Sequence, residues 1–234
     1  MPEIRARPAR PAPLQWQTFF SLLAERFGAT GAVVERSGLS LGNVGQPRAL
    51  FPQARFAHLY RSGPDCALSM SRHIAFRVIL MMLEIAERCG VDSPYELTAE
   101  HFAQVPPALA PLLTGTYDPA LIMDRPIPLP VFGDMWLRWI VDGVRNLEEL
   151  PAGIRTSLSY EDQDLLAEPR EELTRPAGFI GVEARPDWLE AAAGLLDGDG
   201  RRGSAGLLDP AEPEALRQSC AECTAALAGA AGRP

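Results

Sequence analysis

The chain of 234 residues contains no lysine, so all 22 of its basic residues are arginine. Without a lysine amine no Schiff base can form on a side chain, which excludes pyridoxal-phosphate enzymes and lysine aldolases. P-loop ATPases and protein kinases are excluded as well, because each needs a phosphate-binding lysine. Acid–base chemistry in this protein therefore falls to histidine, to a carboxylate or to cysteine, since arginine does not titrate.

Positive charge and long apolar runs are also scarce. The formal net charge is −8, which opposes a phosphate-binding surface and argues against a nucleic-acid partner. The most apolar stretch, Ile74–Ile85, is interrupted by Arg77 and Glu84, so we expect no membrane-spanning helix. A hydrophobic content of 47% is nevertheless ample for a folded core.

Cysteine is infrequent, with four residues in the chain and no spacing typical of a disulfide framework. This usage fits a reducing compartment, and the N-terminal segment Met1–Pro13 lacks the apolar stretch of a secretory signal. We therefore predict a cytoplasmic protein, with residues 1–13 forming a disordered tail.

Two segments predict buried helices. Residues 66–89 are apolar nearly all round, with Gly63-Pro64-Asp65 before them and Gly90 after them, and residues 131–147 repeat this pattern. We predict a mainly α fold, an irregular multi-helix bundle around these two helices, with minor short strands. The smaller predicted elements are helices at 14–27, 51–60, 186–196 and 213–227, a strand at 178–182 and an irregular loop at 37–52.

The composition changes near residue 175, after an acidic stretch. We predict a helical main domain over 14–175 and a small C-terminal unit over 176–234. This unit would be helical or winged-helix-like, because two helices flank a turn and a short apolar run.

Each buried helix carries one polar stripe. On the first helix the spacing places His73, Arg77 and Glu84 on one face, and on the second it places Asp134 and Arg138 together. If the stripes converge they line a polar cavity for an anionic small molecule, and otherwise they face solvent. The candidate catalytic residues are then His73, Glu84 and Asp134, and the candidate ligand-binding residues are Arg77 and Arg138.

Two other motifs provide weaker evidence for a functional site. Cys220 and Cys223 form a lone C-x-x-C, which fits a redox pair or part of a metal site but also lies on the apolar stripe of its predicted helix. We predict core packing for both and no metal site, because no second metal-binding pair accompanies them. The pattern G-x-S-x-G at residues 38–42 lacks the strand and helix that surround a hydrolase nucleophile, so we interpret it as a glycine-rich loop.

These observations favour an accessory or binding protein that acts on a protein or peptide partner, or on a small ligand, in a cytoplasmic pathway. The alternative is a lysine-independent enzyme of small-molecule biosynthesis or redox chemistry, with its site around His73, Arg77, Glu84, Asp134 and Arg138. Haem or iron would suit that alternative, although the sequence identifies no cofactor. A homo-oligomer is compatible with either reading.

Overall fold

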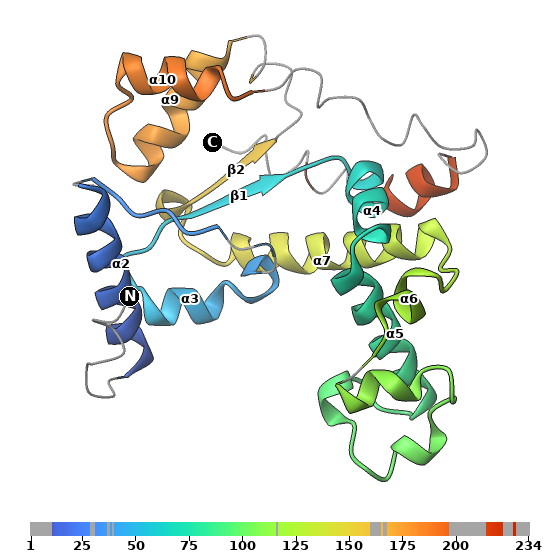
Figure 1. The fold of residues 1–234 in the computed structure, drawn as a ribbon. Coiled ribbons are helices and arrows are strands. Elements are labelled where there is room, and N and C mark those ends of the chain that lie inside the picture. The colour runs from blue at the N-terminus through green and yellow to red at the C-terminus, as the bar shows by residue number, and fades with distance from the viewer. Residues whose placement is uncertain are drawn as a thin grey trace. The chain divides into compact units, whose positions relative to one another are not determined.

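A computed structural model describes residues 11–28, 31–36, 38, 40–115, 117–159, 165, 168–196, 214–221 and 227. Over these residues the chain is mainly helical and has one two-stranded sheet (Figure 1), which confirms the predicted fold class. Among them no single helix is long and apolar enough to cross a membrane. Helices α4 (Gly63–Ser71) and α5 (Ile74–Arg88), bent by 86°, together pass that test on length and composition.

The chain divides into two compact units. Unit 1 comprises Met1–Arg61, Arg138–Arg202 and Ala225–Pro234, and unit 2 comprises Ser62–Leu137 and Gly203–Thr224. The domain limits expected from the sequence, after residues 13 and 175, divide the chain differently and stay predictions.

Unit 2 begins with two helices where the sequence predicts one helix over 66–89. Helix α4 (Gly63–Ser71) ends at a sharp corner, and α5 (Ile74–Arg88) leaves it at 86°. At the corner His73 has an extended backbone, and its Nδ1 accepts a hydrogen bond from the Ala75 amide at 3.2 Å, so it is the N-cap of α5. The prediction of one continuous helix is wrong, because apolar residues continue on both sides of the corner and hide the break.

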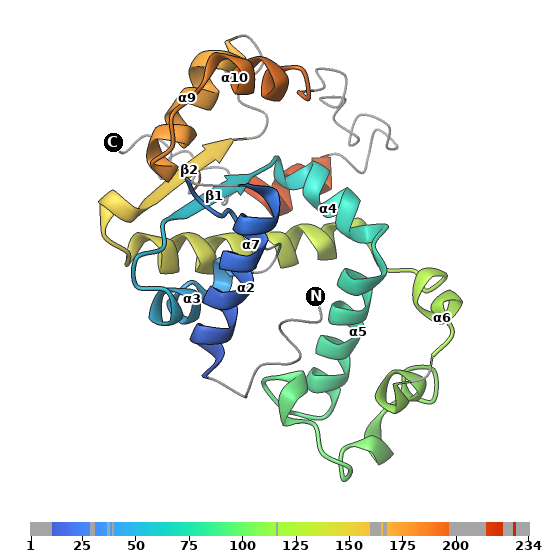
Figure 2. The same cartoon turned by 60° about the vertical axis from the view of Figure 1, so that its left-hand side comes forward.

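The segment after α5 wraps around that helix as short helical pieces, which the prolines and glycines of the sequence indicate. They are η2 (Pro94–Glu96), η3 (Phe102–Gln104), η4 (Ala110–Thr114) and α6 (Pro119–Met123). Figures 1 and 2 show η2–η4 at the C-terminal end of α5 and α6 beside it. The core of this region consists of Met81, Ile85, Val105, Leu109, Leu112 and Ile122.

Helix α7 (Leu129–Glu148) confirms the second predicted buried helix, and the division between the units falls within it. In unit 2, Trp136 of α7 packs tightly against other segments. A Cβ atom on Gly63 would lie 2.4 Å from the Trp136 ring and 2.8 Å from the Cys220 sulfur. Only glycine fits at position 63, because the gap is too small for a methyl group.

Unit 1 begins with α2 (Ala12–Phe27), as predicted. The next segment contains η1 (Ser40–Asn43) and α3 (Gly45–Leu50), so the predicted irregular loop at 37–52 is wrong over these residues. Helix α3 forms although proline follows its first residues, because proline is compatible with the first turn of a helix.

The sheet of unit 1 pairs β1 (Phe56–Tyr60) with β2 (Arg155–Ser159) in parallel. The prediction of a short helix at 51–60 is therefore wrong. Exposure along β1 alternates residue by residue, which is the strand period, but a run of five residues is too short to separate it from a helical period. Strand β2 was not predicted.

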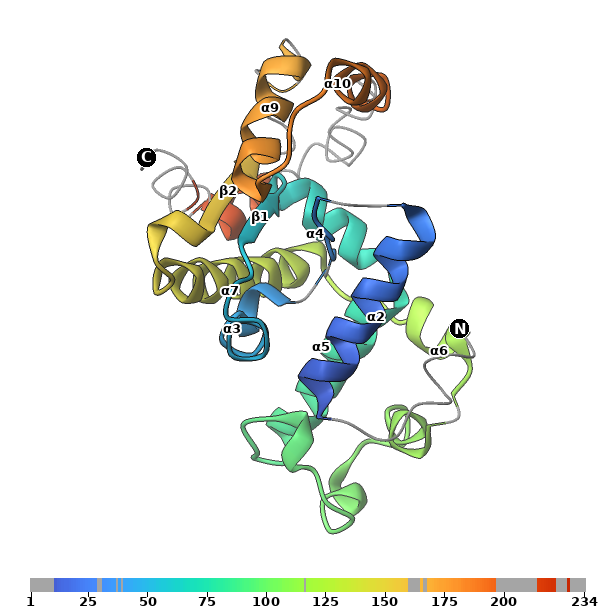
Figure 3. The same cartoon turned by 90° about the vertical axis from the view of Figure 1, so that its left-hand side faces the viewer.

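Unit 1 also contains η5 (Ala152–Ile154) before β2, and α9 (Pro169–Ile180) packed against α10 (Pro186–Ala193), seen at one end of Figure 3. Helix α9 includes most of the predicted strand at 178–182, so that prediction is wrong. The helix ends at Gly181, whose φ of +91° terminates it. The remaining elements of the predicted winged-helix-like unit lie largely outside the described residues.

Candidate functional site

The polar residues predicted to share a cavity occupy different surroundings. His73 is exposed at the start of α5, and Arg77 is buried one turn later. Glu84 is half-buried on α5, whereas Asp134 and Arg138 are exposed on α7. The first four belong to unit 2 and Arg138 to unit 1, and their assignment as catalytic or ligand-binding residues stays a prediction.

The Arg77 guanidinium is occupied by the backbone of unit 2. Its Nε donates to the carbonyl of Ile122 at 2.9 Å and its Nη1 donates to the carbonyl of Ser71 at 2.9 Å. Its Nη2 donates to the carbonyl of Arg125, and the group lies 6.0 Å from the centre of the Phe132 ring. The Arg77 guanidinium thereby links α5 to the end of α4 and to the residues at the end of α6, so its role here is structural.

Glu84 binds a second arginine that the sequence analysis missed. Arg125 donates from Nη2 to Glu84 Oε2 at 2.6 Å, and Arg88 donates from the next turn of α5 at 3.0 Å. Arg125 follows α6 and precedes a proline-rich stretch. Nothing in that local sequence pairs it with Glu84, 41 residues earlier.

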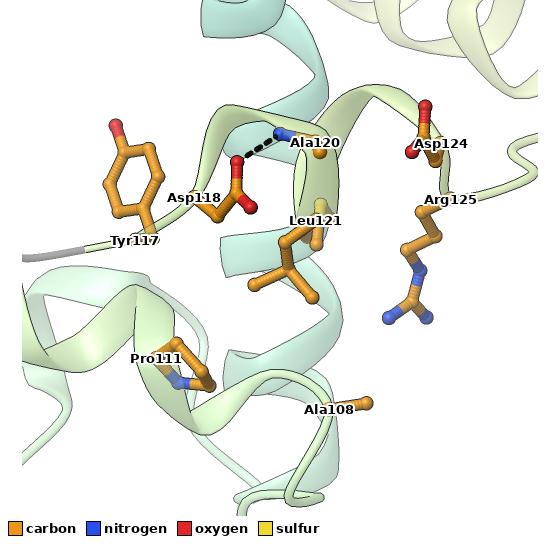
Figure 4. A pocket seen from close by; sticks show the side chains of 9 residues that line it. Ala108, Pro111, Tyr117, Asp118, Ala120, Leu121, Asp124 and Arg125 are labelled. Atoms are coloured by element: carbon orange, nitrogen blue, oxygen red, sulfur yellow. Dashed lines mark hydrogen bonds between the residues drawn. The ribbon is translucent and has the colours of Figure 1, made fainter.

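Beside this ion pair, unit 2 has a pocket of about 630 Å³. Its lining comes from α5, from the η4 region and from α6 with its flanking residues: Met81, Ala108, Pro111, Tyr117, Asp118, Ala120, Leu121, Asp124 and Arg125. Figure 4 shows Leu121 pointing into the middle of the pocket, with Pro111 and Ala108 on the opposite wall. The floor is therefore apolar, and the polar groups stand around it.

The polar groups of the pocket carry an excess of negative charge. Asp118 is the N-cap of α6 and accepts a hydrogen bond from the Ala120 amide at 2.9 Å, and Asp124 ends the same helix. The positive charge of Arg125 is balanced by Glu84. Since the remaining charges are carboxylates, the pocket favours a ligand that carries a cation beside an apolar group.

Cys220 packs in the core of unit 2, as predicted. The residue is 1% exposed, and burial raises the pKa of its thiol. A protonated, buried thiol is a weak nucleophile and a poor metal ligand. The prediction for Cys223 lies outside the described residues, and within the described part of the chain no three histidine, cysteine or acidic residues gather as metal ligands would.

The expected class of ligand, a cation beside an apolar group, follows from the apolar and acidic lining of this pocket. The chain matches no protein-family model, and neither the curated proteins nor the solved structures compared with it include a match.

Proposed function

We propose that this protein is an accessory or binding protein whose unit 2 pocket receives a peptide segment of a partner protein. The segment carries an arginine or lysine next to a large apolar residue. The observation that supports this proposal is the combination, in one pocket, of an apolar floor around Leu121 and two acidic lining residues, Asp118 and Asp124. Figure 4 shows the Asp118 carboxylate beside Leu121 and the Asp124 carboxylate at the outer edge, directed away from Pro111.

The dimensions fit such a segment. A volume of about 630 Å³ lies in the range of pockets that hold small ligands, and it accommodates about two large side chains. An apolar side chain of the peptide would bury against Leu121 and Pro111, and its neighbouring cation would lie near the carboxylates. Tyr117, which is 39% exposed, supplies an aromatic face at the same rim.

The experiment measures fluorescence anisotropy of labelled peptides added to the full chain. A leucine–arginine–leucine peptide should bind, because its arginine is attracted by the pocket carboxylates. The matched leucine–glutamate–leucine peptide should bind at least about tenfold more weakly, because its glutamate is repelled by them. The double variant Asp118→Asn/Asp124→Asn should weaken the basic peptide by about tenfold, because two partly exposed charge pairs are lost. Asparagine at position 118 keeps a good helix N-cap.

The control is Asp92→Asn/Glu100→Gln, which removes the same charge from exposed positions of unit 2 outside the pocket lining. It should leave binding of the basic peptide within about twofold of the unmodified protein. Equal binding of the two peptides, or equal weakening by the two double variants, would show that the pocket carboxylates do not recognise the cation.

A further inference from the structure

One face of the unit 1 sheet carries a group of polar side chains that the proposed function does not use. Paired residues of a parallel ladder place their side chains on the same face, and alternate residues share that face. The register pairs Phe56 with Arg155, His58 with Ser157 and Tyr60 with Ser159. An imidazole, a guanidinium and three hydroxyls therefore lie on one side of β1 and β2.

At His58 this face of β1, which we call the inward face, is buried. His58 is only 8% exposed, whereas Leu59, on the opposite face of the same strand, is 57% exposed. The His58 ring lies 5.5 Å from the Tyr60 ring, measured between centroids. The polar group is therefore held in a largely desolvated position, where each donor and acceptor needs a partner.

Two atoms of these side chains lack hydrogen-bond partners. His58 Nδ1 and Arg155 Nε are both buried, and within the part of the chain that the structure describes neither has a hydrogen-bond partner. Leaving such atoms unpaired costs free energy, so folded proteins rarely contain them. Arg155 lies one same-face position along from Ser157, and Ser157 is directly opposite His58, so Arg155 and His58 are diagonal neighbours on this face.

We propose that the inward face of β1 and β2 is a second binding site, which holds an oxyanion, either a carboxylate or a phosphate, between Arg155 and His58. The guanidinium supplies positive charge and a fork of donors, the geometry that suits both anions. The imidazole donates from Nδ1, and the Ser157 hydroxyl, opposite His58, adds a third donor.

The state of the imidazole fits this role. Burial lowers the pKa of His58 to about 4, so its ring is neutral near neutral pH and has one N–H to donate. The oxyanion thus meets one fixed charge from Arg155 and neutral donors around it. Beside Arg155 and His58 this face carries Tyr60, whose ring lies 5.5 Å from the His58 ring.

The test follows the histidine ring signals of the full chain by NMR during titration with inorganic phosphate and, separately, with acetate. Substitution of each histidine by glutamine assigns the three rings. A saturable shift of the His58 signal, without a comparable shift of His73 or His101, is expected. Phosphate saturating at lower concentration identifies a phosphate ligand, and the opposite order identifies a carboxylate.

Arg155→Gln should weaken the anion by at least about tenfold, because it removes the charge of the site. Arg145→Gln, at an exposed position of unit 1, is the matched control and should change the affinity by less than about twofold. Ser157→Ala provides a smaller change on the same face, with about threefold weaker binding expected, and keeps the test available if Arg155→Gln does not fold. Absence of a saturable His58 shift with both anions, or equal effects of Arg155→Gln and Arg145→Gln, would overturn the proposal.

Discussion

Arg77 shows how a charged side chain is accommodated on an apolar helix. It is 7% exposed, yet each nitrogen of its guanidinium donates to a backbone carbonyl, and the Phe132 ring lies near the group. A buried charged group is tolerated when its donors and acceptors are hydrogen-bonded. The Arg77 guanidinium is hydrogen-bonded by neutral carbonyl oxygens, without a partner of opposite charge.

Replacing Arg77 with methionine should lower the free energy of unfolding by about 2–4 kcal/mol. Three backbone carbonyls would each lose their hydrogen-bond donor, and methionine supplies no donor in its place. They are the carbonyls of Ser71, Ile122 and Arg125. Urea unfolding followed by circular dichroism measures the loss. Arg72→Met, on the exposed C-cap of α4, should change stability by less than about 0.5 kcal/mol. Similar losses in the two variants would mean that these hydrogen bonds contribute little.

The sequence indicated which residues of α5 are unusual, but not what they bind. Arg77 and Glu84 stand out because their neighbours are apolar. Their partners lie 41–48 residues later, and two of the three distant contacts are to backbone carbonyls, which leave no signature in a sequence. The pocket was missed for a similar reason, since Asp118 and Asp124 appear in the sequence only as the ends of a short helix.

At the scale of elements, the sequence predicted α2, α7 and the short helix α10, and it failed at the bend between α4 and α5 and at the two strands. Helices α2 and α7 have long apolar periodicities, so they were predicted within two residues at each end. The corner at His73 was missed because the apolar positions on either side of it continue one helical pattern, and the polar residues at the corner are few. Strands β1 and β2 are five residues each, too short for their period to be distinctive.

Two glycines within helices predict opposite effects of the same substitution. A Cβ on Gly143 of α7 would lie 2.3 Å from Leu41 Cγ, so Gly143→Ala should destabilise the protein by about 1–3 kcal/mol through overpacking. A Cβ on Gly178 of α9 would meet nothing within 4 Å, so Gly178→Ala should stabilise it by about 0.5–1 kcal/mol. Thermal unfolding of both variants measures the difference, and a shift of the same sign in both would contradict this account of helix packing.

At the scale of the whole molecule, acidification has two opposing effects. The net charge of −8 diminishes as carboxylates are protonated, which relieves repulsion. Protonation of His58 has the opposite effect and lowers the stability of the folded chain. Its pKa is about 4 in the folded chain and about 6.5 in an unfolded one, so the unfolded state binds a proton first as the pH falls. The stability that the neutral ring preserves above about pH 6.5 is therefore lost progressively as the pH approaches 4.

The pH dependence should be visible in a His58→Gln variant. Between about pH 7 and about pH 4.5 the unmodified protein should lose up to about 3 kcal/mol more stability than the variant, because glutamine does not titrate. Urea unfolding at each pH, in a buffer without phosphate or acetate, measures this difference. Parallel pH curves for the unmodified protein and His58→Gln would show that burial does not shift this imidazole.

The carbonyl contacts of Arg77 also set an order for folding. Ser71 is close to Arg77 in sequence, but Ile122 and Arg125 are 45 and 48 residues further along. During synthesis, α4 and α5 therefore leave the ribosome with a charged group whose partners have not yet been made, and closing so long a loop carries an entropic cost. The three hydrogen bonds of Arg77 can therefore be complete only after residue 125 has been synthesised.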